Sequence, residues 1–220
     1  MSLKNLLDLG ARNDHKKGLS EERVFAVLDN ARELIAFWRE YPDLFIDFMK
    51  GPDSTFNLYF YQRLFLRAVI RHRYVYAVFP RAYSKSFLSM MILIIRCILY
   101  PGSKLFISTG GKEQSAAIVA SKVEEICKLV PGLGKEIDWT PGRSTSSKDA
   151  VKYTFKNGSV IQNVAATERS RGLRFHGGLL EECVTIDQDI LNEVLIPLMN
   201  VSRYVNGKFK PEETLNKSQI

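Results

Sequence analysis

The stretch that most constrains the fold of this chain is an apolar run followed by a polar turn and a second apolar run. Residues 74–79 are apolar and β-rich, residues 80–84 form a short polar turn, and Lys85 and Ser86 open the strongly apolar segment 87–99. This order predicts a strand, a turn and a buried helix. A turn of this kind places backbone N–H groups at a helix N-terminus, which is a binding site for phosphate groups.

Residues 79–86 match the general phosphate-loop pattern G-x-x-x-x-G-K-[ST] at its last two positions. In that pattern the lysine reaches the β- and γ-phosphates and the hydroxyl that follows binds Mg²⁺, which predicts these roles for Lys85 and Ser86. Phe79 and Ser84 stand where the pattern has glycine. An ordinary strand-to-helix turn with an exposed lysine is the alternative interpretation.

Paired acids about a hundred residues later favour the phosphate-loop interpretation. Residues 177–180 are predicted to form a core strand, and Glu181 and Glu182 follow it at its carboxyl end, where ligands bind in open parallel sheets. Glu181 is predicted to hold Mg²⁺, and Glu182 to position or deprotonate an attacking water. The alternative is a surface pair of glutamates that closes a strand.

Composition and charge limit the class of protein. The chain has 220 residues, enough for one α/β domain with a sizeable core. Its net charge of +7 favours a polyanionic partner, nucleic acid before membrane, although solvated lysines alone also give such a charge. The three cysteines and three histidines are scattered, which argues against a His/Cys metal site. The most apolar run, 87–100, is too short to span a membrane.

The spacing of apolar residues predicts the order of elements along the chain. Helices are predicted over 20–40, 42–50, 56–73, 85–99, 113–130 and 187–199. Strands are predicted over 74–79, 104–111 and 177–180, with a hairpin that joins 150–155 to 159–164 through an Asn-Gly turn. Strand and helix alternate with short joins, which predicts an α/β fold of the P-loop NTPase type, with a mostly parallel sheet flanked by helices.

The same pass predicts how the chain is divided. Residues 1–55 are expected to form an N-terminal helical extension that begins with a loose leader over 1–19. Residues 56–220 are expected to form the P-loop core, and the chain from Asn200 onward is expected to be a polar tail.

Two residues upstream of the turn are candidates for binding a base. Tyr61 and Gln62 precede the phosphate loop by about twenty residues, so the ring can stack on an adenine while the amide reads the edge of the base. The alternative is that Tyr61 belongs to the core and Gln62 to the surface.

Arginines near the two motifs are candidates for stabilising charge on the γ-phosphate. Arg81 lies inside the turn and can reach the phosphate of its own subunit. Arg169, Arg171 and Arg174 lie in a polar loop before the acidic strand and are candidates for an arginine finger toward a neighbouring subunit. Arg171 is favoured because Gly172 beside it permits an unusual backbone turn. A solvated loop is the alternative.

Four motifs taken in order resemble the ATPase half of a tailed-phage terminase large subunit, over roughly residues 50–200. They are Tyr61-Gln62, the phosphate loop Pro80-Arg81-Ala82-Tyr83-Ser84-Lys85-Ser86, Arg171-Gly172-Leu173, and Leu179-Leu180-Glu181-Glu182. The phosphate loops of that family commonly carry an early arginine and can lack the first glycine. Ser84 and Glu181 depart from the family, which has glycine and aspartate at these positions.

The resemblance implies an ATP hydrolase that uses ATP and Mg²⁺ to thread double-stranded DNA into an empty procapsid. It also implies a homo-oligomeric ring on the portal protein, a small terminase subunit as partner, no membrane, and a place in the host cytoplasm. Because the family's nuclease domain and coupling segment do not follow the acidic pair, we expect a C-terminally shortened ATPase domain. The alternatives are a helicase-like translocase of another family and a catalytically degenerate nucleotide-binding assembly module.

Overall fold

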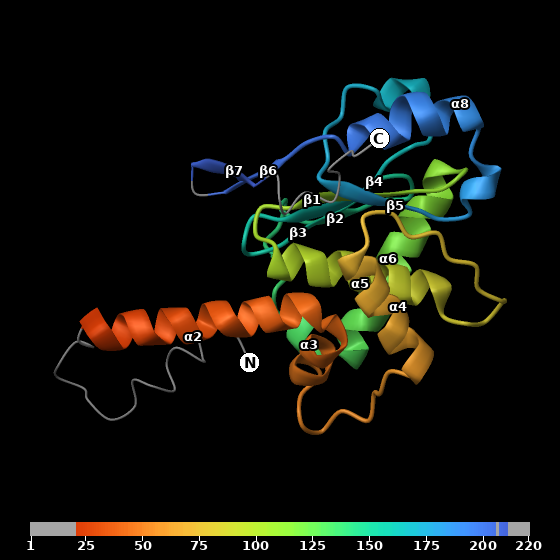
Figure 1. Ribbon diagram of the computed structural model, residues 1–220. Coiled ribbons are helices and arrows are strands. Elements are labelled where there is room, and N and C mark those ends of the chain that lie inside the picture. Colours follow the sequence, from red (N-terminus) through yellow and green to blue (C-terminus); the bar gives the residue numbers. More distant parts are fainter. Residues whose placement is uncertain (1–20, 206, 211–220) are drawn as a thin grey trace.

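The computed structural model describes residues 21–205 and 207–210; the predicted leader 1–19 and most of the predicted tail lie outside these residues. The described chain forms a mixed α/β fold around a five-stranded sheet of strand order β2-β3-β4-β1-β5 (Figure 1). The strands are β1 (Lys104–Ser108), β2 (Thr145–Ser146), β3 (Val151–Thr154), β4 (Val160–Asn163) and β5 (Gly177–Leu180). β1 pairs in parallel with β4 and β5, whereas β3 pairs antiparallel with both β2 and β4. The sheet is therefore mostly but not purely parallel, because the predicted hairpin β3–β4 belongs to it.

The helices confirm most of the periodicity predictions. The long ones are α2 (Glu21–Glu40), α3 (Pro42–Met49), α4 (Phe60–Arg71), α5 (Lys85–Leu99) and α6 (Lys112–Leu129). The shorter ones are α7 (Pro131–Gly134), η1 (Glu168–Ser170), η2 (Cys183–Thr185), α8 (Gln188–Ile190), the π-helical stretch η3 (Leu191–Leu195) and α9 (Ile196–Leu198). The helix predicted over 187–199 is thus one run with a π-helical middle. A second sheet, β6 (Arg203–Val205) with β7 (Lys208–Lys210), occupies part of the predicted tail.

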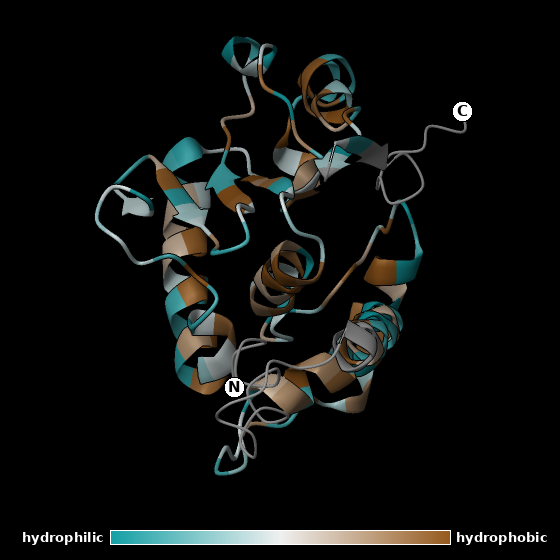
Figure 2. Ribbon diagram, turned by 90° about the vertical axis from the view of Figure 1, so that its left-hand side faces the viewer, coloured by the Kyte–Doolittle hydropathy of each residue, from teal (hydrophilic) through white to brown (hydrophobic). Residues whose placement is uncertain are grey.

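Helix α5 forms the centre of the core. Every residue from Phe87 to Leu99 is buried, and Figure 2 shows α5 as a mostly brown helix in the middle of the molecule. A helix that is apolar on all sides is stable only when other elements surround it. The sheet lies on one side of α5, and α2, α3 and α4 lie on the other (Figure 1). This burial fixes the N-terminus of α5, where Lys85 and Ser86 lie.

Helices flank both faces of the sheet. α5 and α6 pack on one face, and Trp38 and Ile46 from the N-terminal helices share their apolar cluster. On the opposite face, Phe106 of β1 packs with Leu195 and Leu198 of the η3–α9 run. The carboxyl ends of β1 and β5 therefore emerge between two covered faces.

The prediction of a strand over residues 74–79 is wrong. This segment has no regular secondary structure and lies outside the sheet, and Tyr76 and Val78 are 75% and 80% exposed. Phe79 instead packs edge-on against Phe65 of α4, with 5.2 Å between ring centroids. Apolar composition gives β-propensity, but a strand forms only where a neighbouring strand pairs with its backbone groups. Within the described chain, β5 is an edge strand that pairs with β1 alone.

Candidate functional site

The loop before α5 holds an unusual backbone geometry. Ala82 and Ser84 have φ angles of 67° and 54°, which lie in the left-handed region. A non-glycine residue there is destabilised by roughly 1–2 kcal/mol, and such residues gather at functional sites. Ser84 occupies the position where the phosphate-loop pattern has glycine. The loop thus adopts glycine-like geometry at this position although the sequence carries a serine.

The N-terminus of α5 leaves its first amide groups available. Ser84 is the residue that precedes the helix, and its side chain does not cap it. The first N–H groups of a helix have no carbonyl partner within the helix, and together with the helix dipole they attract anions. Residues 80–84 are all exposed to solvent. This end of α5 therefore presents unpaired donors to the outside.

Lys85, Ser86 and Glu181 meet at this point. The Oγ of Ser86 donates a hydrogen bond to Oε1 of Glu181, and the Nζ of Lys85 lies 3.9 Å from the same oxygen. Glu181 is only 4% exposed, and its Oε2 has no hydrogen-bond partner among the described residues. A buried carboxylate oxygen without a partner is costly, which makes it a candidate ligand-binding atom. Two residues adjacent in sequence thus meet one that lies 95 positions later.

Glu182 points to a different neighbour. Its backbone has a φ of 52°, and its exposed carboxylate accepts a hydrogen bond from Nε2 of Gln114 at 3.3 Å. Gln114 lies in the first turn of α6, which begins at the same edge of the sheet as the end of β1. Gln114 was not predicted as a site residue. Its position in the first turn of the helix after β1 could have indicated it, because the carboxyl ends of β1 and β5 are adjacent.

The two candidate base-binding residues differ in their surroundings. The ring of Tyr61 lies 5.6 Å from that of Tyr83 in the loop and 6.1 Å from that of Tyr59, so three tyrosines line one side of the turn. Gln62 is 4% exposed, and its Oε1 accepts the backbone N–H of Tyr59 at 2.9 Å. The carbonyl oxygen of Gln62 therefore caps α4 in this structure.

The candidate arginines are not equivalent. Arg171 donates to Glu193 at 2.7 Å and to Glu168 at 3.1 Å, and these carboxylates raise the pKa of its guanidinium. Arg174 donates to the carbonyl oxygen of Leu173 at 2.8 Å. Arg81 and Arg169 are exposed and make no ion pair or hydrogen bond through their side chains with the residues described. The latter two guanidinium groups are thus available to a ligand or a partner.

The residues at the N-terminus of α5 fit a Mg²⁺ site of the phosphate-assisted kind. Within residues 21–205 and 207–210, no group of three or more His, Cys, Asp and Glu side chains forms a protein-only metal site. Magnesium in phosphate sites takes one or two protein oxygens and completes its shell with water and substrate phosphates. The Ser86 hydroxyl and the Glu181 carboxylate supply two such oxygens.

None of the helices in the described residues combines the length and the apolarity that are needed to cross a lipid bilayer.

Neither protein-family profiles nor curated proteins match this sequence. Among solved structures, the chain is similar to the large terminase ATPase domain of Thermus phage P74-26, with a TM-score of 0.42 and 17% sequence identity. The similarity covers 54% of this chain and 51% of that chain. The chain therefore spans about half the length of the structure it matches, and a likeness of this size assigns no function by itself.

Proposed function

We propose that this chain is an ATP-hydrolysing motor domain, and more specifically the ATPase domain of a terminase large subunit that packages double-stranded DNA. The observation that carries the proposal is the meeting of Lys85 and Ser86 with the buried carboxylate of Glu181 at the N-terminus of α5. The assignment to a terminase is supported by the order of the four motifs in the sequence.

In the proposed site, the first amide groups of α5 and the ammonium of Lys85 bind the β- and γ-phosphates of ATP. Ser86 and Glu181 are the residues that would hold Mg²⁺, and the metal would supply neutralisation of charge on the phosphate oxygens. Glu182 orients the attacking water, and Tyr61 and Tyr83 lie where a base can stack. Arg81 is exposed inside the loop and acts on the γ-phosphate of the same subunit.

The partners of the proposed motor follow from the resemblance of the motifs. They are double-stranded DNA, a portal protein and a small terminase subunit, and the motor assembles as a homo-oligomeric ring in the host cytoplasm. A net charge of +7 supports a polyanionic partner. For the finger toward a neighbouring subunit, Arg169 is exposed and its side chain has no partner among the described residues, whereas Arg171 must first leave two carboxylates. The division into an extension over 1–55 and a core over 56–220 belongs to the same proposal.

The test of the proposal is ATP turnover and ATP binding by the Lys85→Ala variant. Loss of the ammonium removes the charge that neutralises the phosphates, so we expect turnover to fall by a factor of about 100 or more. Lys128→Ala is the matched control, because Lys128 is an exposed lysine that pairs with Glu124 on α6. Undiminished turnover in Lys85→Ala alongside an active control contradicts the proposal.

A degenerate nucleotide-binding module is the second candidate, favoured by a serine in place of glycine at position 84 and by a glutamate in place of aspartate at position 181. Calorimetric titration with ATP and Mg²⁺ separates the two. Binding with turnover supports the motor, and binding without turnover supports the module. A helicase-like translocase is distinguished by duplex unwinding that needs no portal.

A further inference from the structure

An exposed tryptophan lines two hollows at the end of the molecule opposite to the candidate site. Trp139 follows α7 and its side chain is 56% exposed. Two hollows, of about 620 Å³ and about 460 Å³, have Cys127 and Trp139 in their linings. Each volume is within the range of small-molecule sites. The indole is therefore a wall shared by two open spaces.

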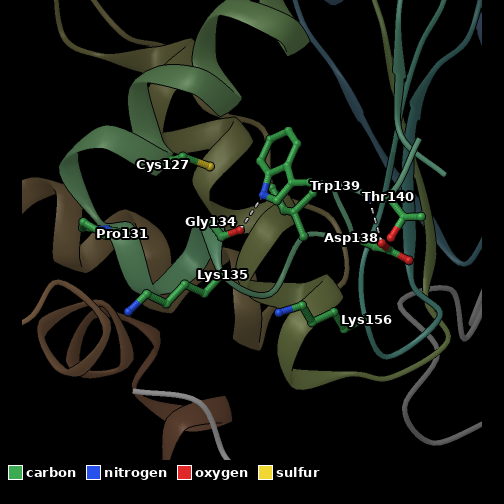
Figure 3. A pocket seen from close by; sticks show the side chains of 9 residues that line it. Cys127, Pro131, Gly134, Lys135, Asp138, Trp139, Thr140 and Lys156 are labelled. Carbon is green, nitrogen blue, oxygen red and sulfur yellow. Dashed lines mark hydrogen bonds between the residues drawn. The ribbon is translucent and has the colours of Figure 1, made fainter. Parts of the chain in front are cut away.

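The indole is held in place although it is exposed. Its Nε1 donates a hydrogen bond to the carbonyl oxygen of Gly134 at 2.9 Å, which Figure 3 shows as a dashed line. Its ring packs against Tyr153 of β3 at 5.9 Å between centroids, with an interplanar angle of 77°. An aromatic side chain that is fixed by a hydrogen bond and a ring contact loses little further entropy when a ligand stacks on it.

The larger hollow has an excess of positive charge. Lys135 and Lys156 both line it and lie on the same side of the indole (Figure 3). Neither ammonium forms an ion pair with a carboxylate of residues 21–205 or 207–210. The acid in the lining is Asp138, whose carboxylate accepts the backbone N–H of Thr140 at 3.0 Å. The lining of the larger hollow thus carries two lysines and one aspartate, whose carboxylate is already bound to the backbone.

This hollow is remote from the proposed ATP site. Helix α6 begins at Lys112 beside the carboxyl end of β1, and Cys127 lies fifteen residues further along it. At 1.5 Å per residue the two positions are separated by about 22 Å. Lys156 lies in the turn before β4, beside the amino ends of β4 and β1. The two sites therefore occupy opposite ends of the parallel strands.

We infer that the Trp139 hollow binds a nucleotide unit of single-stranded nucleic acid, with a base stacked on the indole and phosphates on Lys135 and Lys156. Stacking on a fixed aromatic ring beside cations is the general mode by which proteins hold single strands. A regular duplex does not fit this mode, because its bases are stacked on one another. An acidic peptide could pair with the lysines, but it would leave the indole without a planar partner.

The test uses the fluorescence of Trp139 in the full chain. The sequence has two tryptophans, and Trp38 is 4% exposed, so Trp38→Phe leaves Trp139 as the sole source of tryptophan fluorescence. Titration with a short oligo-dT strand is expected to quench the emission, with affinity that weakens as salt is raised. A duplex of equal length and poly-glutamate are expected to quench at least tenfold less. Equal quenching by either of these probes overturns the inference.

Variants assign the binding to the named side chains. Strand binding, measured by the anisotropy of a labelled oligo-dT, is expected to weaken at least tenfold in Trp139→Ala and in Lys135→Gln with Lys156→Gln, and less in Trp139→Phe. The lysine pair is exposed, so its change does not threaten folding. Lys122→Gln is the matched control, because that lysine pairs with Glu125 outside both hollows. Unchanged binding in the lysine double variant overturns the inference.

Strand binding at the Trp139 hollow does not depend on the proposed ATPase activity. Strand binding is measured without nucleotide and again in Lys85→Ala, where it is expected to be unchanged. A chain that hydrolyses ATP but fails to quench with oligo-dT contradicts the inference alone, and a chain that binds the strand without turnover contradicts the ATPase alone.

Discussion

The two ends of the parallel strands differ in the type of residue that adopts the left-handed backbone conformation. At the amino ends of β1 and β4, the positive φ angles belong to Gly102 and Gly158. At the carboxyl ends, they belong to Ala82, Ser84 and Glu182, and in the described residues no other non-glycine residue has a positive φ. Glycine adopts this conformation without cost, whereas other residues are strained in it.

This difference shows which end of the strands contains backbone strain. The turns at the amino end only reverse the chain, so their glycines leave no strain behind. The loop at the carboxyl end brings Lys85 and Ser86 to Glu181, and its geometry is kept by the burial of α5 rather than by its own residues. Strain that the surrounding structure imposes is typical of ligand sites. We therefore expect changes in the proposed site residues at the carboxyl end to alter ATP turnover, and changes in the backbone turns of either end or at His176 to alter stability.

The largest expected effect is on catalysis at the carboxyl end. Glu182→Gln removes the charge that we propose orients the attacking water, so we expect turnover to fall by a factor of about 100 with ATP affinity nearly unchanged. Glu124→Gln, an exposed glutamate on α6, is the matched control and is expected to retain full turnover. The check is kcat together with ATP binding by calorimetry. Equal turnover in the two variants would break the comparison.

The second effect concerns acid stability at the amino end. His176 accepts the backbone N–H of Lys104 through Nδ1, and burial, with the charges of Lys104 and Arg203, lowers its pKa to about 4. The ring is neutral when folded, but below its ordinary pKa of 6.5 the unfolded chain binds a proton that the folded chain does not. The unfolding free energy should therefore fall as the pH drops from 6.5 to 4, by roughly 1–2 kcal/mol after solvent screening.

Urea unfolding at pH 7 and pH 4.5 measures this loss. His176→Asn keeps a neutral acceptor near the position of Nδ1 but does not titrate, so the difference between the two pH values should shrink in this variant. His72, an exposed histidine at the end of α4, provides the control as His72→Asn. An equal pH effect in wild type and His176→Asn counts against the assignment.

The smallest effect tests the backbone comparison directly through two opposite changes. Ser84→Gly relieves left-handed strain but adds freedom to the unfolded chain, so we expect a net gain of roughly 0.5 kcal/mol in unfolding free energy. Gly158→Ala introduces the same strain where a Cβ meets no atom within 4 Å, and we expect a loss of about 1 kcal/mol. Urea midpoints of both variants give the signs. Destabilisation by Ser84→Gly would show that the loop is not strained.

Local patterns allowed most helices to be predicted, because apolar residues repeat with the helical period over long segments. The hairpin β3–β4 was predictable from Asn157-Gly158, since that pair specifies its turn. The segment 74–79 was predicted wrongly because strand formation depends on a pairing partner, which composition does not reveal. The short hairpin β6–β7 was missed for the related reason that three-residue strands carry little pattern.

The candidate site was predictable in part. The pairing of Ser86 with Glu181 follows from the rule that ligand-binding residues gather at the carboxyl ends of parallel strands. The hydrogen bond from Gln114 to Glu182 and the capping role of Gln62 were not predictable, because both depend on side-chain directions set by packing. The Trp139 hollow was not visible either, since it joins the end of α6 to a hairpin turn through tertiary contacts.

The burial of α5 from Phe87 to Leu99 has a mechanical consequence. Helix α5 is about 22 Å long and is closely packed by surrounding side chains, so it can move only as a rigid unit. Its far end is tied to α2, because the guanidinium of Arg39 donates to the carbonyl oxygen of Leu99 at 2.7 Å. A displacement of α5 at Lys85 should therefore reach Arg39, so a spectroscopic probe attached to α2 is expected to report movement of α5.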